Sequence, residues 1–151
     1  MNEECSDELF RFLNSYHHDH TVENVWVENK GKTFLGGADF DQLKDNEMYL
    51  DKLHHLSIMI ARLNKPVFAK VNGSVRGIAA YVLTMLSTPI GTENSSLRLD
   101  ETSRGFIPIF GGSHRLNRLP CNIGLYLALT GDKLDHEEMA RLGFLKAAMS
   151  E

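Results

Sequence analysis

The 151-residue sequence has few cysteines, no long apolar run and no surplus of positive charge. Its two cysteines, Cys5 and Cys121, lack the spacing of a metal site or a disulfide framework, so we expect a reducing compartment and no metal. No apolar run approaches the length of a membrane-spanning helix, so no membrane partner is expected. The formal net charge of −4 gives no reason to expect direct binding to nucleic acid. The acidic first residues contain no recognisable targeting peptide.

The composition that is present is typical of a globular protein. Hydrophobic residues make up 42% of the chain and charged residues 24%, and the length is sufficient for one buried core. Short apolar runs alternate with segments of helical periodicity, and glycine and proline separate them. Strands that alternate with helices predict a layered α/β fold with parallel crossovers, in a single domain over residues 1–151.

Local signals predict the individual elements. Ser6, followed by two acidic residues, predicts the start of a first helix with an apolar stripe as far as Tyr16. Asp135 and Glu138 predict a capping box at the last helix. The remaining predicted elements are buried strands at 25–27 and 67–71, helices at 49–63, 77–86, 122–130 and 137–142, and extended pieces at 89–91 and 96–99.

Two glycine-containing segments are candidates for a ligand site. In the segment Lys32–Phe40, the pair Gly36-Gly37 lets the backbone approach a ligand and point N–H groups at it. In the segment Lys65–Gly77, a strand runs into an Asn-Gly turn and then into an apolar helix, whose start offers further N–H donors. Each segment alone is more typical of a structural turn, and neither matches a Walker loop or a dinucleotide fingerprint.

Taken in order, the two segments resemble the two oxyanion-hole segments of the crotonase family. The first reads Phe-Leu-Gly-Gly-Ala-Asp and the second Lys-Pro-Val-Phe-Ala-Lys-Val-Asn-Gly. Downstream motifs that agree are Asp100–Thr102, Gly105–Pro108, Gly111–Leu116, Leu129–Gly131 and Ala140–Gly143. Several of them resemble the 3-hydroxyisobutyryl-CoA hydrolase branch, whereas Gly-Ala-Asp resembles the hydratases. The resemblance implies the ClpP/crotonase fold of repeated ββα units, incomplete at both ends, without the opening strands and the C-terminal helices.

The resemblance also implies a chemistry. Members of the family bind an acyl-CoA thioester, so coenzyme A is expected as part of the substrate and no separate cofactor is implied. The backbone N–H groups of Ala38 and Ile78, beside Gly37 and Gly77, would hold the thioester oxygen as it gains negative charge. Glu101 matches the carboxylate that hydratases, hydrolases and several isomerases share, and it would be the catalytic base or nucleophile.

Other carboxylates of the family are replaced. Tyr81 stands where hydratases have one, Ile109 where the hydrolases have one, and Leu53 is the counterpart of a third. Tyr81 and Ile109 would therefore line the substrate site without charge, and hydration, which uses two carboxylates, is disfavoured. Basic residues such as Lys65 and Arg76 are candidates for contacts to the phosphates of CoA, although a surface role is commoner for such residues.

Three functions remain open at this point. The first is an acyl-CoA thioester hydrolase like 3-hydroxyisobutyryl-CoA hydrolase, which belongs to valine breakdown. The second is a non-catalytic relative that serves as a structural subunit of the mitochondrial small ribosomal subunit. The third is an enoyl-CoA isomerase with a single glutamate. The resemblance implies a mitochondrial location and an oligomer or a place in a larger assembly, while enzyme activity is left undecided.

Overall fold

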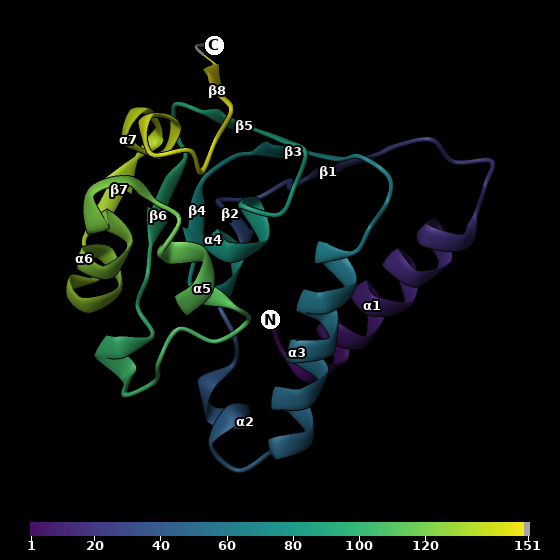
Figure 1. Ribbon diagram of the computed structural model, residues 1–151, viewed down its shortest axis with the longest axis horizontal. Helices are drawn as coiled ribbons and strands as arrows, with labels where there is room; N and C mark the ends of the chain where they lie inside the picture. The colour runs from purple at the N-terminus through teal and green to yellow at the C-terminus, as the bar shows by residue number, and fades with distance from the viewer. Residues whose placement is uncertain (150–151) are drawn as a thin grey trace.

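A computed structural model describes residues 1–149 and contains two four-stranded sheets with helices packed around them (Figure 1). The first sheet has the order β1-β3-β5-β8, and its strands are Val25–Glu28, Val67–Val71, Thr88–Thr92 and Ala147–Met149. The second sheet has the order β2-β4-β6-β7, and its strands are Thr33–Leu35, Ser74–Arg76, Ser96–Arg98 and Lys133–Asp135. All neighbouring strands are parallel except β6 and β7.

The first six strands of the chain enter the two sheets alternately, and helices follow each of these three pairs. The pair β1-β2 is followed by α2 (Phe40–Lys44) and α3 (Glu47–Ala61), and the pair β3-β4 by α4 (Ile78–Leu83). After β5-β6 come η1 (Thr102–Arg104), α5 (Gly112–Leu116), η2 (Pro120–Asn122) and α6 (Ile123–Thr130). The helix α1 (Glu3–His18) precedes the first pair, and α7 (His136–Arg141) lies between β7 and β8. The predicted α/β arrangement of repeated ββα units is confirmed.

Local sequence signals account for several of these boundaries. The helix α3 ends before Pro66, as predicted, and it does so at Ala61, where the N–H of Arg62 donates to the Ile58 carbonyl oxygen. The turn between β3 and β4 contains Gly73 at φ 85°, where an added Cβ would lie 2.2 Å from the carbonyl oxygen of Lys32. The predicted capping box of α7 is confirmed, with both reciprocal hydrogen bonds between Asp135 and Glu138 present. The helix α4 is shorter than predicted, since it ends at Leu83.

Two local predictions are wrong. The helix α1 begins at Glu3 rather than after Ser6, because the Asn2 side chain accepts the N–H of Cys5 at 3.0 Å and caps the helix earlier. Ser6 is buried within the helix, and its hydroxyl donates to the Glu3 carbonyl oxygen at 2.7 Å. The first strand is present but not buried, since Trp26 is 58% exposed. Its exposure accompanies the place of β1 at the edge of its sheet, where no other described strand pairs with its free side.

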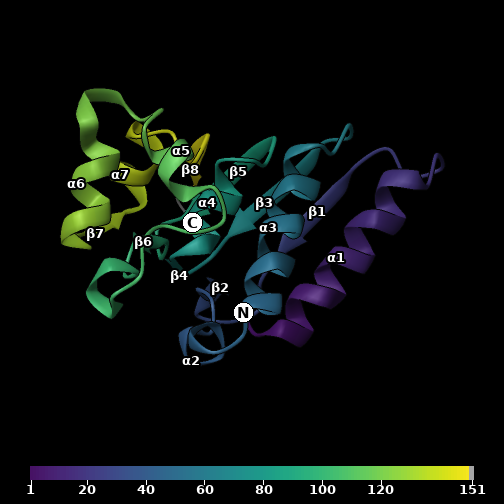
Figure 2. The same ribbon diagram turned by 60° about the horizontal axis from the view of Figure 1, so that its bottom comes forward.

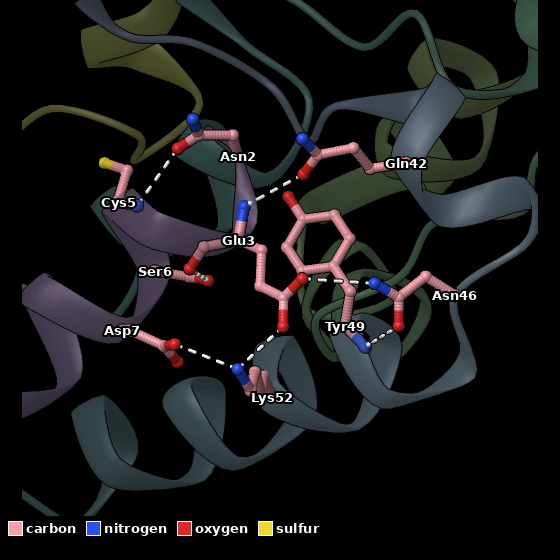
Figure 3. A network of polar contacts seen from close by, with 9 residues as sticks. All are labelled: Asn2, Glu3, Cys5, Ser6, Asp7, Gln42, Asn46, Tyr49 and Lys52. Atoms are coloured by element: carbon pink, nitrogen blue, oxygen red, sulfur yellow. Dashed lines mark hydrogen bonds and ion pairs between the residues drawn. The ribbon is translucent and has the colours of Figure 1, made fainter.

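The helices α1 and α3 lie side by side along one flank of the molecule (Figures 1 and 2). Lys52 of α3 lies between Glu3 and Asp7 of α1, with its Nζ 2.7 Å and 2.9 Å from their carboxylate oxygens (Figure 3). The opposite side of α3 is apolar, and Leu53 is fully buried in the core that it forms with α4. Leu53 is thus a packing residue. Within the described residues, no helix combines the length and the apolar character needed to cross a bilayer.

Candidate active site

The two glycine-containing segments meet at one edge of the second sheet. The glycines of both segments directly follow β2 and β4. These two strands are parallel neighbours, so the chain leaves both of them at the same edge of the sheet. A Cβ added to Gly37 would lie 3.6 Å from the carbonyl oxygen of Arg76, and one added to Gly77 would lie 3.6 Å from the Cα of Gly37. The two backbones therefore lie close together, and a Cβ on either glycine would be in van der Waals contact with the other segment.

Gly77 holds the backbone turn from which α4 starts. Its angles are φ 51° and ψ −122°, which L residues rarely adopt, and its own N–H donates to the Arg98 carbonyl oxygen of β6 at 3.1 Å. The next N–H, that of Ile78, donates no hydrogen bond to any described residue, and neither does the N–H of Ala38 in the first segment. Two unbonded backbone donors thus lie on the two segments that touch. The side chain of Ile78 is buried in the apolar core.

Glu101 joins this pair of segments from a third direction. It follows β6, the other neighbour of β4, and precedes the short helix η1. Its side chain is 1% exposed, and its Oε1 would lie 3.0 Å from a Cβ placed on Gly77. This oxygen has no hydrogen-bond partner in the described chain. Burial raises the pKa of the Glu101 carboxyl above its usual range, and the charge of Asp100 acts in the same direction.

Tyr81 fills the space beside Glu101. Its ring is fully buried and packs so closely against Gly112 that an added Cβ there would lie 2.6 Å from ring carbons and 2.9 Å from Pro108. Burial raises the pKa of the Tyr81 hydroxyl, and the nearby Glu101 carboxylate raises it further. The two side chains are therefore neighbours. No hydrogen bond of ordinary geometry joins them, and the hydroxyl has no other partner in the described residues.

The other residues predicted from the sequence have mixed placements. Ile109 is half-buried against the apolar core and brings no charge to the site. Lys65 is bound elsewhere, because its ammonium donates to the Tyr16 carbonyl oxygen at 2.8 Å and lies over the Tyr16 ring. Arg76 lies on β4, with a guanidinium nitrogen 3.9 Å from the Asp100 carboxylate. Among residues 1–149, no three potential ligands gather at a metal site.

Asp100 is the polar residue of this region that sequence reasoning missed. It is 7% exposed, and its Oδ2 accepts from the Nε of Arg104 at 3.3 Å. Its Oδ1 is buried and has no hydrogen-bond partner among the described residues. The spacing of Asp100 and Arg104, four residues apart, is the one sequence signal that could have indicated this pair. Asp100 therefore places a second negative charge beside Glu101.

Comparison with known proteins places these features in a family. The family model described as enoyl-CoA hydratase/isomerase matches residues 1–151. A probable 3-hydroxyisobutyryl-CoA hydrolase of Arabidopsis thaliana is 31% identical over 145 residues, which are 89% of this chain and 38% of the relative. The small ribosomal subunit protein mS47 of the same plant is 29% identical over 144 residues, which are 89% of this chain and 35% of that protein. The chain thus spans less than two fifths of the length of these relatives.

Solved structures show the same fold. An enoyl-CoA hydratase from Bacillus anthracis superposes with a TM-score of 0.86 at 25% identity, over 96% of this chain and 59% of that one. An enoyl-CoA hydratase from Rhodobacter sphaeroides superposes with a TM-score of 0.90 at 22% identity, over 99% of this chain and 48% of that one. The predicted crotonase-like fold is therefore confirmed for the part of the family's length that this chain spans. From its sequence and its fold together, the chain belongs to the enoyl-CoA hydratase/isomerase, or crotonase, family.

Proposed function

We propose that the protein binds an acyl-CoA thioester and hydrolyses it with Glu101 as the catalytic carboxylate. The main support is the position of Glu101, a buried carboxylate with an unpartnered oxygen, against the contact between Gly37 and Gly77. An unpaired buried acid is costly to a fold, and groups of this kind concentrate at functional sites. The names of the plant relatives favour 3-hydroxyisobutyryl-CoA as the substrate.

The backbone donors would supply the electrostatic part of the catalysis. In this proposal the thioester oxygen lies between the N–H groups of Ala38 and Ile78, both unbonded in the described chain. As water adds to the carbonyl carbon, the C=O bond opens and the oxygen takes up negative charge, which the two fixed donors stabilise. Gly37 and Gly77 allow the close backbone approach that such contacts require, because neither has a side chain in the way.

Glu101 would move the proton. Its carboxylate takes a proton from the attacking water, so that a hydroxyl group is transferred to the carbonyl carbon. When the C–S bond breaks, the CoA sulfur leaves with the electron pair and takes the proton from Glu101. The products are the free acid and CoA thiol. Because burial raises its pKa, the Glu101 carboxyl is better matched to proton exchange near neutral pH than an exposed glutamate is.

The side chains around Glu101 favour this reaction over hydration. Tyr81 and Ile109 stand where relatives have carboxylates, so Glu101 would act as the one acid-base group in direct reach of the thioester. Tyr81 and Ile109 would line the acyl side of the site without charge. Isomerisation of a double bond also requires only one carboxylate, and analysis of the products formed from a 3-enoyl-CoA tests that alternative.

The test is release of free thiol from 3-hydroxyisobutyryl-CoA by the purified chain. We expect Glu101→Gln to reduce the rate roughly 100- to 10,000-fold, the usual contribution of a positioned acid-base group. Glu93→Gln makes the same chemical change at an exposed turn residue and should leave the rate unchanged. Equal rates for Glu101→Gln and the wild type would refute the proposal, as would absence of thiol release by a folded wild-type chain.

A second candidate is a structural role in the mitochondrial small ribosomal subunit. Two observations favour it, namely the likeness to mS47 and the ring of Tyr81, which fills the space beside Glu101. A mitochondrial location is proposed for either function, because a relative from Xenopus tropicalis is named a mitochondrial hydrolase. Sedimentation of the tagged chain with that ribosomal subunit, at the same level for Glu101→Gln, would favour this role. Sedimentation as a free protein would count against it.

A further inference from the structure

A cavity lies at the C-terminal end of α4, opposite the end at which Ile78 begins the helix. Ile78 begins this helix at the candidate active site, whereas Leu83 and Thr84 at its other end line a cavity of about 300 Å³. The remaining walls come from α5 and the turn after it, from Pro89 of β5, and from the chain between α7 and β8. Figure 2 shows α5, α7 and β8 gathered on the same side of the molecule. The cavity is thus separate from the site already described.

Three cations line this cavity, and no acidic residue among residues 1–149 does. They are Arg115 of α5, Arg118 just after it, and Lys146 before β8. None of the three forms a salt bridge with a residue of the described chain. The whole chain has a formal net charge of −4, so a general surplus of basic residues does not explain a local group of three. The concentration of positive charge is a property of this cavity.

The two arginines lie close enough to repel each other, and neither has an acidic partner in the described part of the chain. The Nε of Arg115 is buried and has no hydrogen-bond partner in the described residues. Burial lowers the pKa of Arg115, and the neighbouring charge of Arg118 lowers it further. A guanidinium nitrogen of Arg118 lies 2.9 Å from the Nε2 of His114, and this contact orients the arginine. A buried donor without a partner is costly to a fold, and an anion in the cavity would satisfy the Nε of Arg115.

We propose that the cavity formed by α4, α5 and the α7–β8 connection binds a small molecule through a phosphate group. Guanidinium groups donate two parallel hydrogen bonds to phosphate oxygens, and an ammonium adds a mobile point charge. The cavity is larger than a phosphate ion requires, and the leucines Leu83, Leu86, Leu119 and Leu142 line it beside the cations. An apolar wall with a few fixed polar groups is the usual construction of a small-molecule site. The ligand is therefore an organic phosphate or diphosphate.

Calorimetric titration with inorganic phosphate, pyrophosphate and acetate at constant ionic strength tests this site. We expect saturable binding of both phosphate probes, tighter for pyrophosphate, and none for acetate over the same range. Arg118→Gln, at an exposed position, should weaken pyrophosphate binding about 10-fold or more, because it removes a charge-assisted hydrogen bond. Arg115→Lys keeps the charge but loses the two-nitrogen geometry, and it should also weaken binding.

Arg11→Gln is the matched control, since Arg11 is an exposed arginine of α1 outside this cavity. It should bind pyrophosphate as the wild type does. The proposal is overturned if the folded wild type shows no saturable binding. It is also overturned if acetate binds as tightly as phosphate, or if Arg11→Gln weakens binding as much as Arg118→Gln does. Far-ultraviolet circular dichroism of each variant establishes that a lost signal reflects the site and not an unfolded chain.

Discussion

The contact between Gly77 and Glu101 makes a quantitative prediction about Gly77→Ala. The backbone of Gly77 has φ 51° and ψ −122°, outside the left-handed helical region, and holding an L residue in such a sparsely populated conformation costs about 1–3 kcal/mol. The added Cβ would also lie 3.0 Å from Oε1 and 3.3 Å from Cδ of Glu101, so the buried carboxylate must move. Overpacking of this kind costs about 1–3 kcal/mol. We expect Gly77→Ala to lower the free energy of unfolding by about 2–6 kcal/mol.

Gly105→Ala is the reference for a positive φ without a steric contact, in the left-handed region at φ 80° and ψ 16°. Gly105 also has a positive φ, 80°, but a Cβ there would have no atom within 4 Å. This variant should therefore lose only about 1–2 kcal/mol, the cost of the backbone conformation. Urea denaturation followed by circular dichroism measures both values. If Gly77→Ala is no more destabilising than Gly105→Ala, Glu101 does not lie against the start of α4, and the site geometry is wrong.

A double variant isolates the contact itself. In the pair Gly77→Ala and Glu101→Ala, the carboxylate that obstructs the new Cβ is gone. The two changes should then cost less together than the sum of their separate costs, by about 1–2 kcal/mol. Additive losses would mean that the strain at Gly77 comes from its backbone alone. Such a result would concern only the steric contact between Gly77 and Glu101. The proposed catalytic role of Glu101 is tested separately, by thiol release.

Three further predictions concern charge and capping. Burial raises the pKa of the Glu101 carboxyl, so the folded chain binds this proton more tightly than the unfolded chain does, and the free energy of unfolding should fall as pH rises from the ordinary glutamate pKa through the folded value. Urea titrations at several pH values measure this dependence, and Glu101→Gln should remove it. An unchanged pH dependence in the variant would contradict the burial of Glu101. Lys52→Met should cost about 1 kcal/mol at low salt and less at high salt, because its partners Glu3 and Asp7 are about one third exposed; a loss that is independent of salt would refute the ion-pair account. Asp135→Ala should cost about 1 kcal/mol through the lost cap of α7, measured by thermal unfolding, and no loss would contradict it.

The fold was predictable because its determinants are local. Pro66 disfavours helical angles at the residue before it, and the Asn72-Gly73 pair forms the turn between β3 and β4. The strand at Val67–Val71 is a short apolar run between two such signals. The exposure of Trp26 was not predictable in this way, because it depends on which strand ends up at the edge of the sheet. That order is set by pairing between segments far apart in the sequence.

The candidate site was predictable only in part. Motif order indicated the glycines and Glu101 as parts of one site, and the β2-β4-β6 sheet brings the three strand ends together. The packing of Tyr81 against Gly112 joins residues on two different helices, and no local pattern indicates it. Asp100 was missed for a similar reason, because its burial and its contact with Arg76 depend on how β4 and β6 align. Side-chain environments of this kind follow from the complete fold rather than from a motif.

The central claim is that Ala38, Ile78 and Glu101 together receive a thioester, and the amide protons of the first two residues report on it most directly. The measurement is a titration of ¹⁵N-labelled Glu101→Gln protein with 3-hydroxyisobutyryl-CoA, in which turnover is slow enough for spectra to be recorded. We predict saturable downfield shifts of the Ala38 and Ile78 amide protons, larger than that of Gly105, as they donate to the thioester oxygen. The claim would be contradicted if other amide signals shifted saturably while those of Ala38 and Ile78 did not move. It would also be contradicted if no amide signal shifted saturably.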